Sequence, residues 1–149
     1  MSEDSFNGPT HSVAVHEYER LEHTADAFVK CTGKTLEECF ANAAYAMFDQ
    51  TLDLKGVEPK ETLRIETDGR DYEERLYNFL SELLFIEDTE RMFFSEFNVM
   101  FEDDKVICDA AGEGLDFNKH TVRTEVKAVT YHMLEVNEKE LYVTVLFDI

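Results

Sequence analysis

The chain has 149 residues, of which 33 are Asp or Glu and 14 are Lys or Arg, so its formal net charge is −19. A field of this sign repels phosphate backbones, whose binding depends on Lys and Arg displacing counterions. The charge therefore argues against direct nucleic-acid binding and favours a cationic protein or a metal ion as the partner. The alternative is that the charge serves solubility alone.

A chain of this length forms one domain and buries a sizeable core without disulfides or a structural metal. We expect residues 1–12 to be an unstructured tail and residues 13–149 to form the domain. The three cysteines, Cys31, Cys39 and Cys108, lie in apolar stretches and have no CxxC spacing. We therefore predict that they are buried thiols in a reducing compartment. No apolar run approaches the ~20 residues of a membrane span, and the N-terminus lacks a signal-peptide pattern. We therefore expect an intracellular protein, cytoplasmic or nuclear or both, that does not associate with membranes.

The first third of the domain predicts two strands and a helix. Alternating apolar residues favour strands over residues 13–22 and 27–33, and the helix is expected over residues 35–52. Thr35 and Glu38 form an S/T-x-x-E capping box, in which the hydroxyl and the carboxylate each satisfy an unpaired backbone N–H. Apolar residues then recur along one stripe: Leu36, Phe40, Ala43, Ala44 and Met47. This stripe predicts one buried face.

A strand over residues 62–69 leads into a second predicted helix, residues 71–88, with Asp71 as its N-cap and Glu74 at the third position. Its stripe consists of Leu76, Phe79, Leu80, Leu83 and Leu84, and again predicts one buried face. The segment GKTLEECF, from residue 33, resembles GRDYEERL, from residue 69. The similarity indicates either an internal duplication or a generic strand-to-helix junction.

The rest of the chain alternates with period two. Strands are expected over residues 94–104, 105–114, 125–138 and 141–149, with a hairpin turn at residues 137–140. Two amphipathic helices packed on one largely antiparallel β-sheet would bury both stripes. The predicted fold class is therefore α+β, a single two-layer domain.

A metal site is suggested by carboxylates near both ends of the domain. Asp26 precedes a predicted strand, close to His23, and Asp148 lies next to the main-chain carboxylate of Ile149. Pairing of the terminal strands would bring these groups together as hard oxygen ligands, which suit calcium, magnesium or manganese. The alternative is that Asp26 caps a turn and Asp148 is merely solvated.

Lys119, Arg123 and Lys127 make residues 119–127 a locally basic segment, and His120 and His132 lie near the two ends of TEVKAVTYH, residues 124–132. Its Lys127 is expected on a strand, on the face opposite its apolar neighbours Val126 and Ala128. A lysine in this position is costly to desolvate unless carboxylates receive it. It could instead pair with Glu125, and both histidines could be structural.

The sequence contains no GxSxG elbow, no Walker GxxxxGK[ST] and no GxGxxG, and AGEG at residues 111–114 is only a turn signal. No cysteine lies in an electropositive setting that would activate it as a nucleophile. These observations argue against an independent enzyme.

Several segments together resemble the archease family. They are HTAD (residues 23–26), GKTLEECFANAAYAMF (33–48), FLSELL (79–84), GEGLDFNKH (112–120), TEVKAVTYH (124–132) and the final DI. They occur in the family's order from about residue 16 onward. TEVKAVTYH combined with HTAD and the final Asp-Ile is highly specific.

The resemblance implies a small α/β protein that activates the RNA ligase joining tRNA exons and does not itself catalyse ligation. That ligase joins a 2′,3′-cyclic or 3′-phosphate end to a 5′-hydroxyl through a guanylylated histidine, using GTP and a divalent metal. Archease is implied to promote guanylylation and multiple turnover. By motif, the implied metal-binding positions are Asp26, Asp148 and Ile149, and Lys127 falls on a position needed for activity.

Two other functional classes remain open. A chaperone or general protein-modulating module would suppress aggregation of unrelated proteins regardless of the carboxylates. A self-contained metal-dependent enzyme would turn over small phosphorylated substrates without a protein partner.

Overall fold

The computed structural model describes residues 17–21 and 26–149. In chain order, its elements are β1 (Tyr18–Leu21), β2 (Asp26–Thr32), α1 (Leu36–Thr51), η1 (Leu54–Gly56), β3 (Glu61–Asp68), α2 (Tyr72–Glu90), β4 (Met92–Glu102), β5 (Lys105–Gly114), β6 (Ala128–Asn137) and β7 (Tyr142–Asp148). Every predicted helix and strand is present, with shifted ends. The predictions for residues 1–12, for the beginning of the first strand and for His23 lie outside the described residues.

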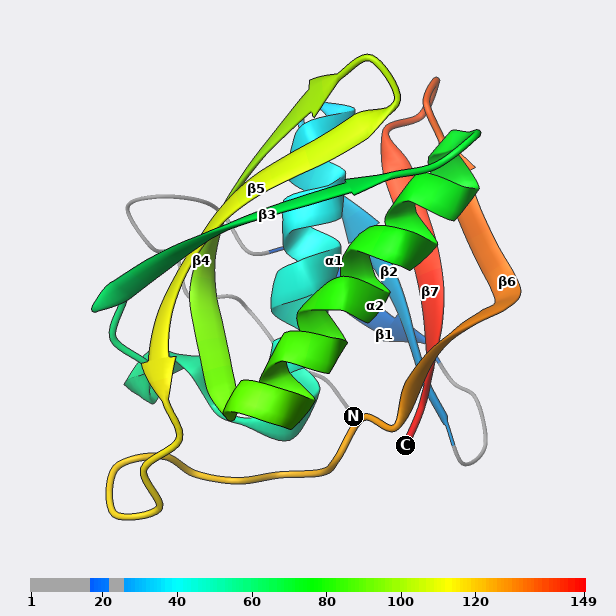
Figure 1. The fold of residues 1–149 in the computed structure, drawn as a ribbon. Coiled ribbons are helices and arrows are strands. Elements are labelled where there is room, and N and C mark those ends of the chain that lie inside the picture. Colours follow the sequence, from blue (N-terminus) through cyan, green and yellow to red (C-terminus); the bar gives the residue numbers. More distant parts are fainter. Residues whose placement is uncertain (1–16, 22–25) are drawn as a thin grey trace.

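Within the described residues, the strands form two antiparallel sheets with the helices between them (Figure 1). One sheet has the order β1-β2-β7-β6 and the other the order β3-β5-β4. The α+β class with two helices and antiparallel strands is confirmed, but the strands are shared between two sheets where a single sheet was expected. Helix α1 packs against both sheets, and helix α2 contacts β3 of one sheet and β6 of the other.

Helix α1 is buried on almost every side, so the prediction of a single buried face was wrong for this helix. Twelve of its 16 residues are buried, because α1 packs against β4 of one sheet and against β2 and β7 of the other. Phe48 makes edge-on ring contacts with Phe93 and Phe94, at centroid distances of 6.0 and 5.7 Å. Helix α2 has the predicted single face, buried at Leu76, Phe79, Leu80, Leu83 and Glu87.

The junction between β2 and α1 is held by three hydrogen bonds. The Thr35 hydroxyl accepts from the backbone N–H of Glu38 (3.1 Å), whose carboxylate accepts from the N–H of Lys34 (2.9 Å). One turn further along the helix, the Asn42 amide donates to the carbonyl of Thr32 at 2.7 Å. These bonds satisfy backbone groups at the helix start that have no partner within the helix.

The junction between β3 and α2 repeats this construction. The Asp71 carboxylate accepts from Glu74 N–H (2.8 Å), and the Glu74 carboxylate accepts from Arg70 N–H (2.7 Å). The Asn78 amide donates to the carbonyl of Asp68 at 2.8 Å. The repeat seen in the sequence therefore extends to an asparagine that anchors each helix to the end of its preceding strand.

Residues 115–127 form an extended connection from β5 to β6, which we call the strap (Figure 1). Part of it was expected to belong to the following strand, but β6 begins only at Ala128. The strap covers the C-terminal end of α1, where the carbonyls of Gln50 and Thr51 accept from the N–H groups of Thr124 (3.1 Å) and Arg123 (2.7 Å). The strap thus supplies donors that the end of a helix lacks.

Glu113 anchors the first part of the strap. Its side chain is only 9% exposed and accepts from Glu58 N–H (2.9 Å), Lys119 Nζ (3.0 Å) and His120 Nε2 (2.9 Å). The His120 Nδ1 accepts from the N–H of Asp116, which leaves Nε2 as the protonated nitrogen. Burial alone would raise the pKa of Glu113, but these hydrogen bonds together lower it to about 2.

Glu87 is a second buried carboxyl, 5% exposed, in the last turn of α2. Burial raises its pKa to about 7, and the nearby Asp88 and Glu125 carboxylates add to the effect. The Arg91 guanidinium offsets only part of this increase, because it lies 3.9 Å away and is largely solvated. Glu87 therefore binds a proton more tightly in the folded protein than in the unfolded chain.

We expect Glu113→Gln to lower the free energy of unfolding at pH 7 by about 2 kcal/mol, because it removes a buried charged acceptor from three donors. Glu113 stabilises the fold above the pKa of an unfolded Glu, and this contribution disappears as the pH falls from about 4 toward 2. Urea unfolding across this range should show the two proteins converge at low pH. Equal stability of wild type and variant at pH 7 would contradict the role of Glu113; Glu58→Gln, at a side chain 59% exposed, is the matched control.

The raised pKa of Glu87 predicts the opposite pH dependence. The folded protein retains this proton to higher pH than the unfolded chain does, so stability is lost as the pH rises from about 4 through 7. Glu87→Gln should remove this loss and raise the free energy of unfolding at pH 8 by about 1–3 kcal/mol. Glu90→Gln, at an exposed position in the same helical turn, should have little effect. A Glu87→Gln protein no more stable than wild type at pH 8 would refute this prediction.

Candidate functional site

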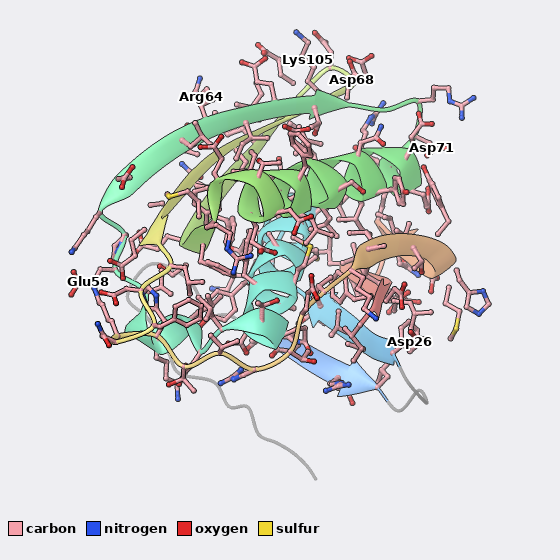
Figure 2. All side chains as sticks on the ribbon, turned by 60° about the horizontal axis from the view of Figure 1, so that its bottom comes forward. Asp26, Glu58, Arg64, Asp68, Asp71 and Lys105 are labelled. Carbon is pink, nitrogen blue, oxygen red and sulfur yellow. The ribbon has the colours of Figure 1, made fainter. Side chains whose placement is uncertain are left out.

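The antiparallel pairing of β2 with β7 places Asp26 directly opposite Asp148. Figure 2 shows Asp26 at the end of β2, across the molecule from Glu58. Residues directly opposite in an antiparallel pair project from the same face of the sheet. The intervening positions of both strands belong to the core: Ala27, Val29, Cys31, Val143, Val145 and Phe147. By alternation, both aspartates project from the outer face, away from the helices.

Lys127 reaches the same end of the sheet through its backbone. Its N–H donates to the Asp148 carbonyl at 2.7 Å. It lies one residue before β6, so its predicted place on a strand was wrong by that residue. Its ammonium has no ion-pair partner in the described part of the chain, Glu125 included. Val126 next to it is 3% exposed and fixes the backbone, whereas the lysine side chain is exposed.

The Lys127 side chain lies on the helix side of the sheet. It lines a groove of about 230 Å³ between α2 and the start of β6, together with Tyr77, Ser81, Leu84, Phe85, Asp88, Ala128 and Val129. The structure thus brings Lys127 and the aspartates to one end of the sheet but directs them to opposite faces. Sequence reasoning missed the groove, although the recurrence of residues 77, 81, 84, 85 and 88 at helical spacing was a detectable signal.

Ile149 follows Asp148 and packs part of its side chain against the core. This apolar contact holds the end of β7 in place. The main chain of Ile149 adds oxygen atoms directly after Asp148.

The carboxylate oxygens of Asp26 and Asp148 are ligands of the kind that a hard cation prefers. Two carboxylates alone do not complete a metal site. Two like charges directly opposite in a strand pair repel each other, and a bound cation relieves this repulsion. Among residues 17–21 and 26–149, no group of three or more His, Cys, Asp or Glu side chains could hold a metal. A hard cation also accepts main-chain carbonyls, neutral side-chain oxygens and water as further ligands. A basic group also reaches this edge, since Arg20 donates to the Asp26 carbonyl at 3.4 Å.

His120 and His132 lie in different environments. His120 is 5% exposed and anchors the strap through Glu113, so it serves a structural role. His132 is exposed on β6, within the irregular pairing between Thr130 and Glu135.

The cysteines are buried as predicted. Burial raises the pKa of Cys39 to about 11 and that of Cys108 to about 12, and raises the pKa of Cys31 as well. A thiol with so high a pKa forms little thiolate, so these residues are poor nucleophiles. In the described residues, neither helix is long and apolar enough to cross a membrane.

Comparison with known proteins gives a consistent result. A model of the Archease protein family matches residues 18–149. The archease of Sulfurisphaera tokodaii is 40% identical over 135 residues, which cover 89% of this chain and 97% of that protein.

Solved structures agree with the sequence comparison. Protein 1598 of Methanobacterium thermoautotrophicum superposes with a TM-score of 0.78 at 39% identity, covering 90% of this chain and 99% of that one. A Thermotoga maritima archease, described as a possible chaperone, shares the fold with a TM-score of 0.59 at 20% identity, covering 88% of this chain and 96% of that one. The match over 18–149 and the close relatives show that this chain belongs to the archease family.

Proposed function

We propose that this protein is a non-catalytic activator of the tRNA-splicing RNA ligase, and that it promotes guanylylation of the ligase and its multiple turnover. The observation that carries the proposal is the pairing of Asp26 with Asp148, with Lys127 hydrogen-bonded to the Asp148 carbonyl at the same end of the sheet. Family membership supports an accessory protein, and the ligase is the partner that the archease motifs imply.

The paired carboxylates act by offering negatively charged oxygens that can be presented to a partner's active site. Together with the main-chain carboxylate of Ile149, Asp26 and Asp148 would hold a calcium, magnesium or manganese ion. Such an ion, when bound, supplies charge neutralisation at the phosphates of GTP during transfer to the ligase histidine. The chain's own contribution is to hold the carboxylates at a fixed separation, on rigid paired strands rather than on a loop.

Lys127 adds a positive charge near the two carboxylates, and the hydrogen bond from its N–H to the Asp148 carbonyl fixes its backbone. Because its ammonium lacks an ion-pair partner among the described residues, it is available to contact a phosphate or a carboxylate of the ligase. The neighbouring negative charge of the chain favours rapid encounter with a ligase whose RNA groove must be basic.

Asp148→Ala should abolish stimulation of ligase guanylylation while the protein remains folded, because the exposed side chain contributes little to the core. The measurement is transfer of radiolabelled GMP from GTP to the ligase in manganese, with and without each variant. Asp68→Ala is the matched control, since Asp68 lies on the opposite sheet (Figure 2) and should stimulate as wild type does. Full stimulation by Asp148→Ala would refute the proposed role.

Metal binding is tested on the free protein. Titration calorimetry with calcium or manganese should detect a site in wild type that is weakened strongly by Asp26→Ala, by Asp148→Ala and by deletion of Ile149. The reason is that each change removes or displaces one oxygen ligand. Unchanged binding by all three variants would place the metal elsewhere, and absence of binding by wild type would leave the carboxylates to act only within the ligase complex.

A chaperone-like role is the second candidate, favoured by aromatic side chains left exposed at the surface, Phe85 at 61% and Phe117 at 75%. It predicts suppression of aggregation of an unrelated unfolded protein, unaffected by Asp148→Ala. Under the activator proposal, such suppression is weak and guanylylation depends on the carboxylates.

A further inference from the structure

Helix α2 carries a second stripe at the margin of its buried face. Tyr77, Ser81, Leu84, Phe85 and Asp88 recur at i, i+4, i+7, i+8 and i+11 and line one side of the groove. Lys127 at the end of the strap forms the other side, with Ala128 and Val129 at the start of β6. The groove therefore has one wall from a helix and one from the edge strand of the four-stranded sheet.

An exposed aromatic anchor lies in this groove. Phe85 is 61% exposed, although a phenyl group gains most from burial among the side chains of this surface. Tyr77, also in the groove, stacks on Tyr131 of β6 with ring centroids 4.1 Å apart. The stack joins the helix wall to β6.

The charge around the groove is acidic. Helix α2 contains six acidic residues and a single basic one, Arg75. Glu74 is paired with Arg70 and Glu87 is buried, so Glu73, Glu82, Asp88 and Glu90 remain to set the potential along the helix. Asp88 lines the groove on the helix side, and Lys127 lines it on the strand side. A groove with an apolar centre and an acidic helix wall fits a basic partner that offers one apolar side chain.

The groove is also continuous with the candidate site. Lys127 lines it with its side chain and donates its backbone N–H to Asp148. A partner held in the groove is thereby placed at the end of the sheet where Asp26 and Asp148 project. Among the described residues, no other charged residue both lines the groove and bonds to Asp148.

We infer that this groove is the surface that docks the ligase, and that its occupant is a basic segment of the ligase with one apolar side chain packed against Phe85. This inference rests on the proposed function, because it takes the ligase as the partner. It assigns separate tasks to the two regions: the groove sets affinity, and the carboxylates set the degree of stimulation.

The test compares Phe85→Ala with Phe117→Ala, which removes an exposed ring in the strap, away from the groove. Calorimetry measures the Kd for the purified ligase, and guanylylation is measured across a range of activator concentrations. We expect Phe85→Ala to raise the Kd about tenfold or more, as loss of an interface anchor does. Its stimulation at saturation should equal that of wild type, whereas Asp148→Ala should bind normally and fail to stimulate.

A charge reversal provides an independent arm. Asp88→Lys should weaken ligase binding and reduce its dependence on salt, whereas Asp68→Lys on the opposite sheet should change both much less. If Phe85→Ala and Asp88→Lys bind the ligase as tightly as their controls do, the groove is not the docking surface. The proposed function would remain intact. Binding that depends on Phe85 without stimulation by wild type would overturn the proposed function and support the groove. A wild-type protein that does not bind the ligase, or a groove that binds unfolded chains instead, would overturn the assigned occupant.

Discussion

The pairing of β2 with β7 is the constraint on which the rest of the structure depends. It joins residues from the beginning of the described chain to its last strand, in a register from Asp26 opposite Asp148 to Thr32 opposite Tyr142. Because side chains alternate between faces, a slip of one residue would turn Val143, Val145 and Phe147 out of the core. The same slip would separate the two aspartates. Core packing therefore fixes the geometry of the candidate site.

Full burial of α1 requires that its polar groups find partners inside the protein. Asn42 donates to the end of β2, and Gln50 Nε2 donates to the Ala46 carbonyl at 3.0 Å. The carbonyls of its last turn are satisfied by the strap. An unsatisfied buried polar group costs about 1–3 kcal/mol, so the strap is part of the core's hydrogen bonding as well as a connection. This coupling ties the position of Lys127 to the stability of α1.

The sequence predicted those features of the structure that depend on neighbouring residues. The capping residues Thr35 and Asp71 predicted where both helices begin, and pairing of the terminal strands was the basis for grouping Asp26 with Asp148. The division into two sheets and the burial of α1 depend on which strands pair, which period-two alternation does not encode. Lys127 was placed on a strand because its neighbours alternate, but hydrogen bonds to the end of α1 hold the strap away from the sheet. The groove was missed because Leu84 belongs to both features: it packs partly against the core, as predicted, and it also lines the groove beside Phe85.

The edge strand β6 determines how a partner can approach. An exposed edge would normally recruit another strand, but pairing of β6 with β7 is irregular between Thr130 and Glu135. Met133 in this stretch has a φ of 60°, a left-handed conformation that disfavours regular strand addition. A partner is therefore directed to the beginning of β6, where the groove opens on the helix side and the aspartates project on the other. Under the proposed docking, a ligase that binds this end from both faces would contact Phe85 and Lys127 on one face and Asp148 on the other, so affinity and stimulation would depend on different residues that lie close together.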